Sequence, residues 1–295
     1  MAFLDNLTNQ ATPQEAAVTS GVAILTLSGG FTDLERRLIS IFRDEFPLLS
    51  RLQEVVFAQL VERAIDLVQK QGAAADVHGF VQRYIAPAIP HPQDRIATYR
   101  YAYALAMANL NVDSGEQALL DALKSDLSLD PAACEQAEAA SQAEFAALHS
   151  ALAATALGFI VVAADGVVQQ SELDNVKAAR NLFAPIARLD DTQFALIYDL
   201  GVSIYNRFLT DPNNRRVFLY QILIPYFNTP ELRTQAFHYA ASICTSDGDI
   251  ARAEIDTLKD VLTALQLDDA TGEQIFSSYM ANVKTIDGKP NPPPQ

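Results

Sequence analysis

Four carboxylates in the second half of the chain have a spacing that could bind a cation. Asp165 and Glu172 are seven residues apart, and so are Asp247 and Glu254. If the segments that carry them converge, the four acidic side chains would repel one another unless a cation lay among them. Oxygen-only ligands favour a hard ion, so the expected cofactor is a divalent cation such as Ca²⁺, Mg²⁺ or Mn²⁺. The twelve-residue loop of an EF-hand is not present in the sequence.

The same turns also have a structural interpretation. Gly166 and Gly248 follow the two aspartates, where a left-handed residue would end one helix. The glutamates would then fall at the third position of the next helix. A carboxylate at that position can accept the backbone N–H of the N-cap residue. On this interpretation the acidic residues are solvated turn residues with no metal.

Capping boxes are predicted at the corresponding turns of the first half. Thr32 with Glu35 and Asp113 with Glu116 have the required spacing of three residues. In the second half Ala251 takes the place of a capping residue, yet the glutamate remains. Helix capping alone therefore does not explain why the second half keeps its glutamate where the capping residue is missing.

These four turns indicate that the chain contains two copies of one domain. The turns begin at Ser28, Asn109, Asp165 and Asp247, which lie 81 and 82 residues apart within a copy and 137 and 138 apart between copies. The 138-residue offset aligns further identical residues: Pro87 with Pro225, Arg95 with Arg233, Leu127 with Leu265, Leu129 with Leu267, and Asp130 with Asp268. We interpret this pattern as a tandem duplication.

Apolar residues recur at three- and four-residue spacing along nearly the whole chain, which predicts an all-α fold. The repeats place one domain at residues 12–133 and a second, with the acidic turns, at 151–285. Residues 134–150 are rich in Ala, Glu and Gln and are expected to form a helical connector. Residues 286–295 are rich in proline and are expected to be a disordered or extended tail.

The pattern of a helix, an ADG turn and a second helix resembles the tellurite-resistance TerB-like family. The supporting segments are AADGVVQQSE (163–172) and TSDGDIARAE (245–254). The resemblance implies two tandem TerB-like multi-helix domains, each with two pseudo-repeated helix-turn-helix halves. It also implies a metal-binding centre at the four carboxylates of the second copy, and a degenerate first copy without the aspartates. Members are associated with chemical-stress response and with membrane-linked multiprotein systems.

Composition restricts the partners of this chain. Its 295 residues carry a net charge of −15, with a pI near 4.6, which disfavours nucleic acid and favours cations or proteins. Only Cys134 and Cys244 are present, as expected in a reducing compartment, and no secretory signal is evident, so we expect a cytoplasmic protein. The longest apolar run, 151–164, is too short to span a bilayer and predicts a buried helix. Residues 2–7 could form an amphipathic contact with a membrane surface or a partner.

Other residues give weaker signals. The histidines have neither metal nor triad spacing: His78, His91, His149 and His238. Tyr99 and Tyr103 are four residues apart and are expected to face the core. Arg215 and Arg216, with Arg207 nearby, form a basic spot that could hold an anion or pair with surface acids. No Walker loop or nucleophile elbow is found, so no enzyme is predicted.

Two functions remain open from the sequence. The first is a non-enzymatic module of the TerB-like kind that binds a divalent cation or acts in a stress response. The second is an acidic helical scaffold that binds other proteins and has no metal site.

Overall fold

A computed structural model of the chain describes residues 11–27, 29–166, 170–246, 248–281, 283–286 and 289–290. These residues are mostly helical, which confirms the predicted all-α class. The chain divides into two compact units, residues 1–145 (unit 1) and 146–295 (unit 2). The division falls inside the stretch 134–150 that the sequence predicts as a connector.

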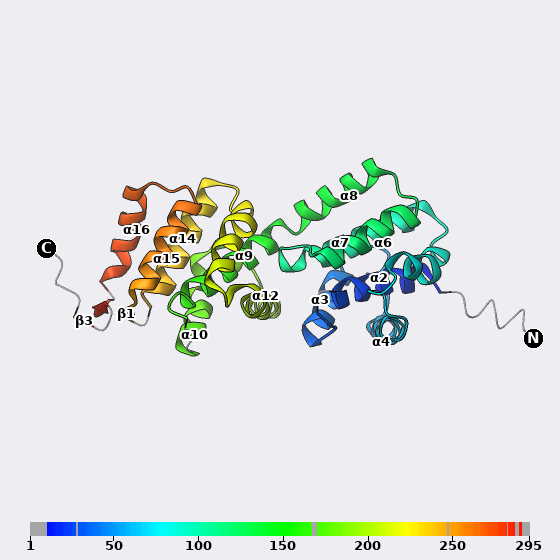
Figure 1. The fold of residues 1–295 in the computed structure, drawn as a ribbon, viewed down its shortest axis with the longest axis horizontal. Coiled ribbons are helices and arrows are strands. Elements are labelled where there is room, and N and C mark those ends of the chain that lie inside the picture. The colour runs from blue at the N-terminus through cyan, green and yellow to red at the C-terminus, as the bar shows by residue number, and fades with distance from the viewer. Residues whose placement is uncertain are drawn as a thin grey trace, which may run out of the picture. The chain divides into compact units, whose positions relative to one another are not determined.

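Unit 1 is built around its first described helix (Figure 1). Its α-helices are α2 (Pro13–Leu27), α3 (Asp33–Arg43), α4 (Glu54–Gln71), α5 (Val77–Phe80), α6 (Pro92–Ala106), α7 (Ser114–Asp126) and α8 (Pro131–Glu144). Short turns are η1 (Val81–Ile85), η2 (Ala86–Ala88) and η3 (Met107–Asn109). α2 packs against α4 and α6 and is buried from Ala16 to Leu25. α8 packs against α6, so this part of the predicted connector belongs to the body of unit 1.

Unit 2 is built around α9 in the same way. Its α-helices are α9 (Ala146–Val162), α10 (Gln170–Ala178), α11 (Ala184–Ala187), α12 (Asp191–Ile204), α13 (Pro212–Phe218), α14 (Pro230–Cys244), α15 (Arg252–Ala264) and α16 (Asp269–Met280). Short turns are η4 (Ala179–Leu182), η5 (Tyr205–Leu209), η6 (Leu219–Leu223) and η7 (Ile224–Tyr226). α9 packs against α12 and α14 and is buried from His149 to Val162, as the apolar run predicts.

The elements of the two units correspond at the offsets found in the sequence. The first residues of α6, α7 and α8 lie 138 positions before those of α14, α15 and α16. The π-helical turns η1 and η6 and the 3-10 turns η2 and η7 are also 138 apart, whereas α3 and α4 precede α10 and α12 by 137. Side-chain contacts recur as well, because Arg95 Nε donates to the Ile89 carbonyl at 2.8 Å and Arg233 Nε donates to the Phe227 carbonyl at 2.9 Å.

Local sequence explains where many of these helices begin and end. Both predicted capping boxes of unit 1 are present, at Thr32 and Asp113. Asp130 and Asp268 each accept the N–H of the third helical residue, at 3.1 and 2.8 Å. These bonds satisfy donors that a helix cannot satisfy internally.

Unit 2 also contains three short paired strands. The sequence did not predict them. β1 (Asp249–Ile250) pairs in parallel with β2 (Thr285–Ile286), and β2 pairs antiparallel with β3 (Lys289–Pro290). Two-residue strands are too short to show the alternation by which strands are recognised. Residues 287–288 and 291–295 of the predicted tail lie outside the described residues.

Candidate functional site

The glycines that follow the two aspartates of unit 2 have the backbone conformation that the sequence predicts. Gly166 has a φ of +88° and Gly248 a φ of +84°, a left-handed conformation that glycine adopts at little cost. Asp165 is exposed on the first turn. Asp247 lies outside the described residues, and so does the side chain of Glu172.

Glu254, the fourth predicted ligand, acts as a capping residue. Only 9% of its surface is exposed, and its Oε2 accepts the N–H of Ala251 at 2.8 Å. In unit 1, Glu35 and Glu116 accept the N–H of their own N-cap residues, also at 2.8 Å. The presence of Glu254 therefore has a structural reason even though Ala251 has no capping oxygen.

The turn before Glu254 is held by a segment from much later in the chain. The N–H groups of Lys284 and Thr285 donate to the Gly248 carbonyl at 2.7 and 3.1 Å. The hydroxyl of Thr285 also hydrogen-bonds to the carboxylate of Asp249. β1 and β2 continue this contact, so the position of the turn depends on the C-terminal strands as well as on its own motif.

The predicted cation site lies partly outside the described residues. Among the described residues, no group of three or more His, Cys, Asp or Glu side chains is arranged to hold a metal ion. That set omits Asp247 and the side chain of Glu172. Carboxylate oxygens suit a hard cation, but one oxygen of Glu254 already accepts a backbone N–H. The four-carboxylate centre stays a prediction.

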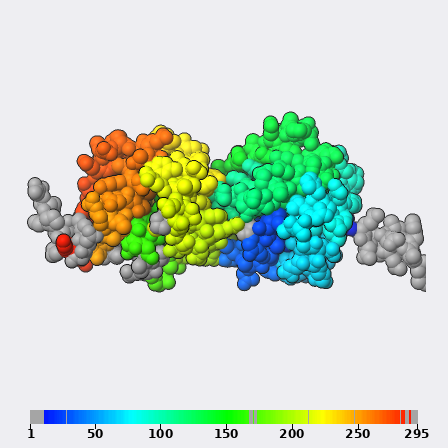
Figure 2. Space-filling model, in the orientation of Figure 1, coloured from blue at the N-terminus to red at the C-terminus, as the bar shows by residue number. Residues whose placement is uncertain are grey.

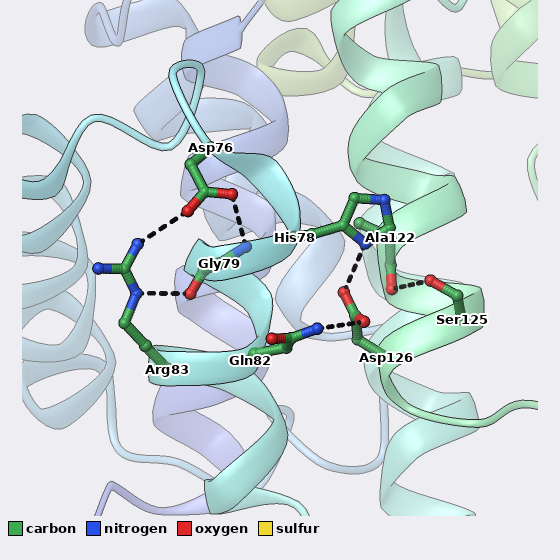
Figure 3. A network of polar contacts seen from close by, with 8 residues as sticks. All are labelled: Asp76, His78, Gly79, Gln82, Arg83, Ala122, Ser125 and Asp126. Carbon is green, nitrogen blue, oxygen red and sulfur yellow. Dashed lines mark hydrogen bonds and ion pairs between the residues drawn. The ribbon is translucent and has the colours of Figure 1, made fainter.

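A His–Asp pair in unit 1 resembles part of a catalytic triad (Figure 3). His78 Nδ1 lies 2.8 Å from Asp126 Oδ2, and Gln82 Nε2 donates to Asp126 Oδ1 at 2.9 Å. Ser125 is adjacent in sequence, but its hydroxyl donates to the carbonyl of Ala122 at 3.2 Å. This network therefore connects α5 and η1 to α7 and does not activate the serine as a nucleophile.

Buried aromatic and imidazole groups complete the cores of the two units. Tyr99 and Tyr103 are buried, as their spacing predicts. His149 is 4% exposed and meets the Tyr226 ring edge-on, with centroids 5.7 Å apart. Desolvation by burial lowers the pKa of His149 to about 4, so this imidazole is neutral at neutral pH.

Three helices of unit 2 form an apolar groove. The groove has a volume of about 510 Å³ and lies between α14, α15 and α16. Phe237 and Leu258 form its buried base, while Leu262 and Phe276 are partly exposed. Gly272 lets α16 lie close to α15, because a Cβ at that position would be 2.7 Å from Leu262. Figure 2 shows side chains of α15 and α16, in orange, on the surface of unit 2.

The rim of this groove is acidic. Asp269 and Glu273 line it and are exposed. Lys259 also lines it, so the charged lining consists of two carboxylates and one ammonium. A basic ligand would therefore be favoured at the rim.

The equivalent positions of unit 1 hold a polar cluster. Tyr99, Lys124 and Glu138 lie 138 residues before Phe237, Leu262 and Phe276 of the groove. The Tyr99 hydroxyl donates to Glu138, and Lys124 Nζ lies 2.9 Å from Glu138 Oε1. Burial raises the pKa of Tyr99, and the hydrogen bond to Glu138 raises it further. Comparing the two repeats residue by residue would have revealed this difference from the sequence.

The comparisons with known proteins give no relative. No protein-family model, curated protein or solved structure matches the chain. The resemblance to the TerB-like family rests on the turn motif and its recurrence, and it stays a prediction.

The sequence also raises the question of membrane contact. No single helix among the described residues combines the length and the apolar composition that a membrane crossing needs. The consecutive helices α8 and α9 have the required length and apolar composition only when they are counted as one segment. Residues 2–7, which could form an amphipathic contact, lie outside the described part of the chain.

Proposed function

We propose that this chain is a non-enzymatic helical module that binds a protein partner through the groove of unit 2. The contrast between two copies of one fold supports this proposal. At the same positions, one copy joins its helices with the Lys124–Glu138 ion pair, and the other presents the apolar side chains of Leu262 and Phe276. The free energy falls when a partner covers partly exposed apolar groups and removes them from water.

The ligand whose chemistry fits the groove is an amphipathic helix with basic residues beside its apolar stripe. Helices of this kind bind in apolar grooves through side chains spaced three and four residues apart. Asp269 and Glu273 supply negative charge at the rim, and the chain as a whole carries a net charge of −15. Acidic ligands would be repelled by the same field.

The test uses a fluorescent Leu/Lys amphipathic peptide of about 18 residues, which is five helical turns. Binding is followed by fluorescence anisotropy at physiological salt, where long-range charge effects are screened. The decisive variant, Leu262→Lys/Phe276→Glu, places the ion pair of unit 1 in the groove of unit 2. We expect at least about tenfold weaker binding, because the apolar walls are replaced by charges.

The matched control, Val55→Lys/Val56→Glu, makes the same charge change at residues that are 68% and 39% exposed in unit 1. We expect it to bind as the wild type does, and circular dichroism checks that both variants are helical. Equal peptide affinity of the groove variant and the wild type would exclude the groove as the binding site. A peptide with glutamate in place of lysine should bind more weakly, and equal binding would refute the charge argument.

Divalent-cation binding is the second candidate function. The observation in its favour is that two left-handed glycines, Gly166 and Gly248, follow aspartates at equivalent turns of one unit. The four predicted carboxylates would be the ligands of a hard cation, which would tie the helices of unit 2 together. The link to stress response rests on the TerB-like resemblance alone.

Thermal unfolding of metal-free protein tests this candidate with Ca²⁺, Mg²⁺, Mn²⁺ and Zn²⁺ in turn. A cation that binds only the folded state adds about 2.7 kcal/mol at a hundred times its dissociation constant. Asp165→Asn/Asp247→Asn should abolish the response, and Asp174→Asn/Asp269→Asn is the charge-matched control. Stabilisation that survives in the first variant, or none in the wild type, would reject the site.

A further inference from the structure

A second, smaller pocket of unit 2 contains a buried arginine. The pocket has a volume of about 210 Å³ and is formed by the end of α9, by α13 and η6, and by α15. Arg215 and Arg216 from α13 line it, with Thr257 and Asp260 from α15. Pockets for drug-sized ligands are usually about 300 to 1,000 Å³, so this one suits a small ion or group.

Among the described residues, the Arg215 guanidinium has fewer acceptors than its burial requires. Only 9% of the residue is exposed, and its Nη1 donates to the Ala163 carbonyl just beyond α9. Nε is buried and has no hydrogen-bond partner in the described part of the chain. A guanidinium keeps its charge and offers five N–H donors, so burying it with one carbonyl acceptor is costly. The partial negative charge at the C-terminus of α9 offsets only part of that cost.

The charged side chains that line the pocket give it a net positive charge in a strongly acidic protein. Arg216 is exposed, and its Nη2 lies 3.9 Å from Asp260 Oδ1, which is too long for a tight ion pair. Arg215 and Arg216 together exceed the single negative charge of Asp260. An anion that enters would meet the buried guanidinium at a distance from bulk water, where the attraction is stronger.

We infer that this pocket binds a small phosphate-class oxyanion. Arg215 supplies the buried guanidinium, Arg216 closes over the ligand from the exposed side, and Thr257 contributes a hydroxyl donor. Arginine suits this role because its planar fork matches the oxygens of a phosphate. The ligand is either free inorganic phosphate or the phosphate group of a small monoester. The site is separate from the groove of the proposed function and does not depend on it.

Isothermal titration calorimetry at constant ionic strength tests the inference with inorganic phosphate and glycerol phosphate. Titration to about 10 mM detects dissociation constants in the millimolar range. We expect Arg216→Gln to weaken phosphate binding at least about tenfold, because it removes one charge-assisted contact. Asp260→Asn should instead strengthen binding, because it removes the one opposing charge. Tighter binding of glycerol phosphate than of phosphate would identify the monoester as the ligand.

Two further variants distinguish a loss of anion binding from a folding defect and from a general effect of net charge. Arg215→Lys keeps the charge and loses the planar fork, and we expect weaker binding with helicity intact. Arg188→Gln removes an exposed arginine outside the pocket and should leave the affinity unchanged. The inference is overturned if the wild type binds neither anion, or if Arg216→Gln and Arg188→Gln change the affinity equally.

Discussion

Burial of His149 predicts that unit 2 loses stability in mild acid. The folded state protonates this imidazole only near pH 4, whereas an unfolded chain protonates it near the ordinary pKa of 6.5. Between these values the unfolded state binds more protons, so the free energy of unfolding falls as the pH falls. Below about pH 4 both states are protonated and this contribution no longer changes.

The size of the effect follows from the two pKa values. At pH 7 the imidazole is mostly neutral in both states, and at pH 4.5 it is neutral only in the folded one. The linkage relation gives a loss of about 2 kcal/mol between these two pH values. That is a large share of the stability of a typical domain, about 5 to 15 kcal/mol.

Amide hydrogen exchange in α9, measured by mass spectrometry at pH 7 and pH 4.5, reports the stability of unit 2 separately from that of unit 1. His149→Phe keeps an aromatic ring beside Tyr226 and removes the titrating group. On acidification, the free energy of unfolding of the variant should therefore fall by about 2 kcal/mol less than that of the wild type. His91→Gln removes an exposed histidine and serves as the control, with the wild-type response expected. If His149→Phe and the wild type differed by less than about 0.5 kcal/mol in this response, burial of a neutral imidazole would not explain the pH dependence.

Three backbone and packing predictions can be checked by urea unfolding. Ser128 has a φ of +51°, so Ser128→Gly should stabilise unit 1 by about 1 kcal/mol, and destabilisation would contradict the strain argument. A Cβ at Gly201 would lie 2.7 Å from Thr155 Cγ2, so Gly201→Ala should cost about 1 to 3 kcal/mol in unit 2, and a neutral result would mean that α12 shifts freely. Asp113→Ala removes a side-chain acceptor for two backbone N–H groups and should cost about 1 kcal/mol, whereas Asp113→Asn should retain most of the stability.

Features that depend on a few neighbouring residues could be predicted from the sequence. The capping boxes at Thr32 and Asp113 and the left-handed turns at Gly166 and Gly248 were all expected. Their geometry depends on residues within about four positions, which a motif contains in full. The cation site could not be decided in the same way, because its four carboxylates come from two turns far apart in sequence.

The sequence by itself determined the all-α class, the helix boundaries at caps and glycines, and the offset at which the two copies correspond. The sequence also contains the different residue types at equivalent positions of the two copies, but only the tertiary structure decided which of those side chains meet. The tertiary structure brought Lys124 to Glu138 in one unit, left an apolar groove in the other, and placed the guanidinium of Arg215 against the end of α9. The physical reason is distance along the chain, since such contacts join side chains from helices that meet only after folding.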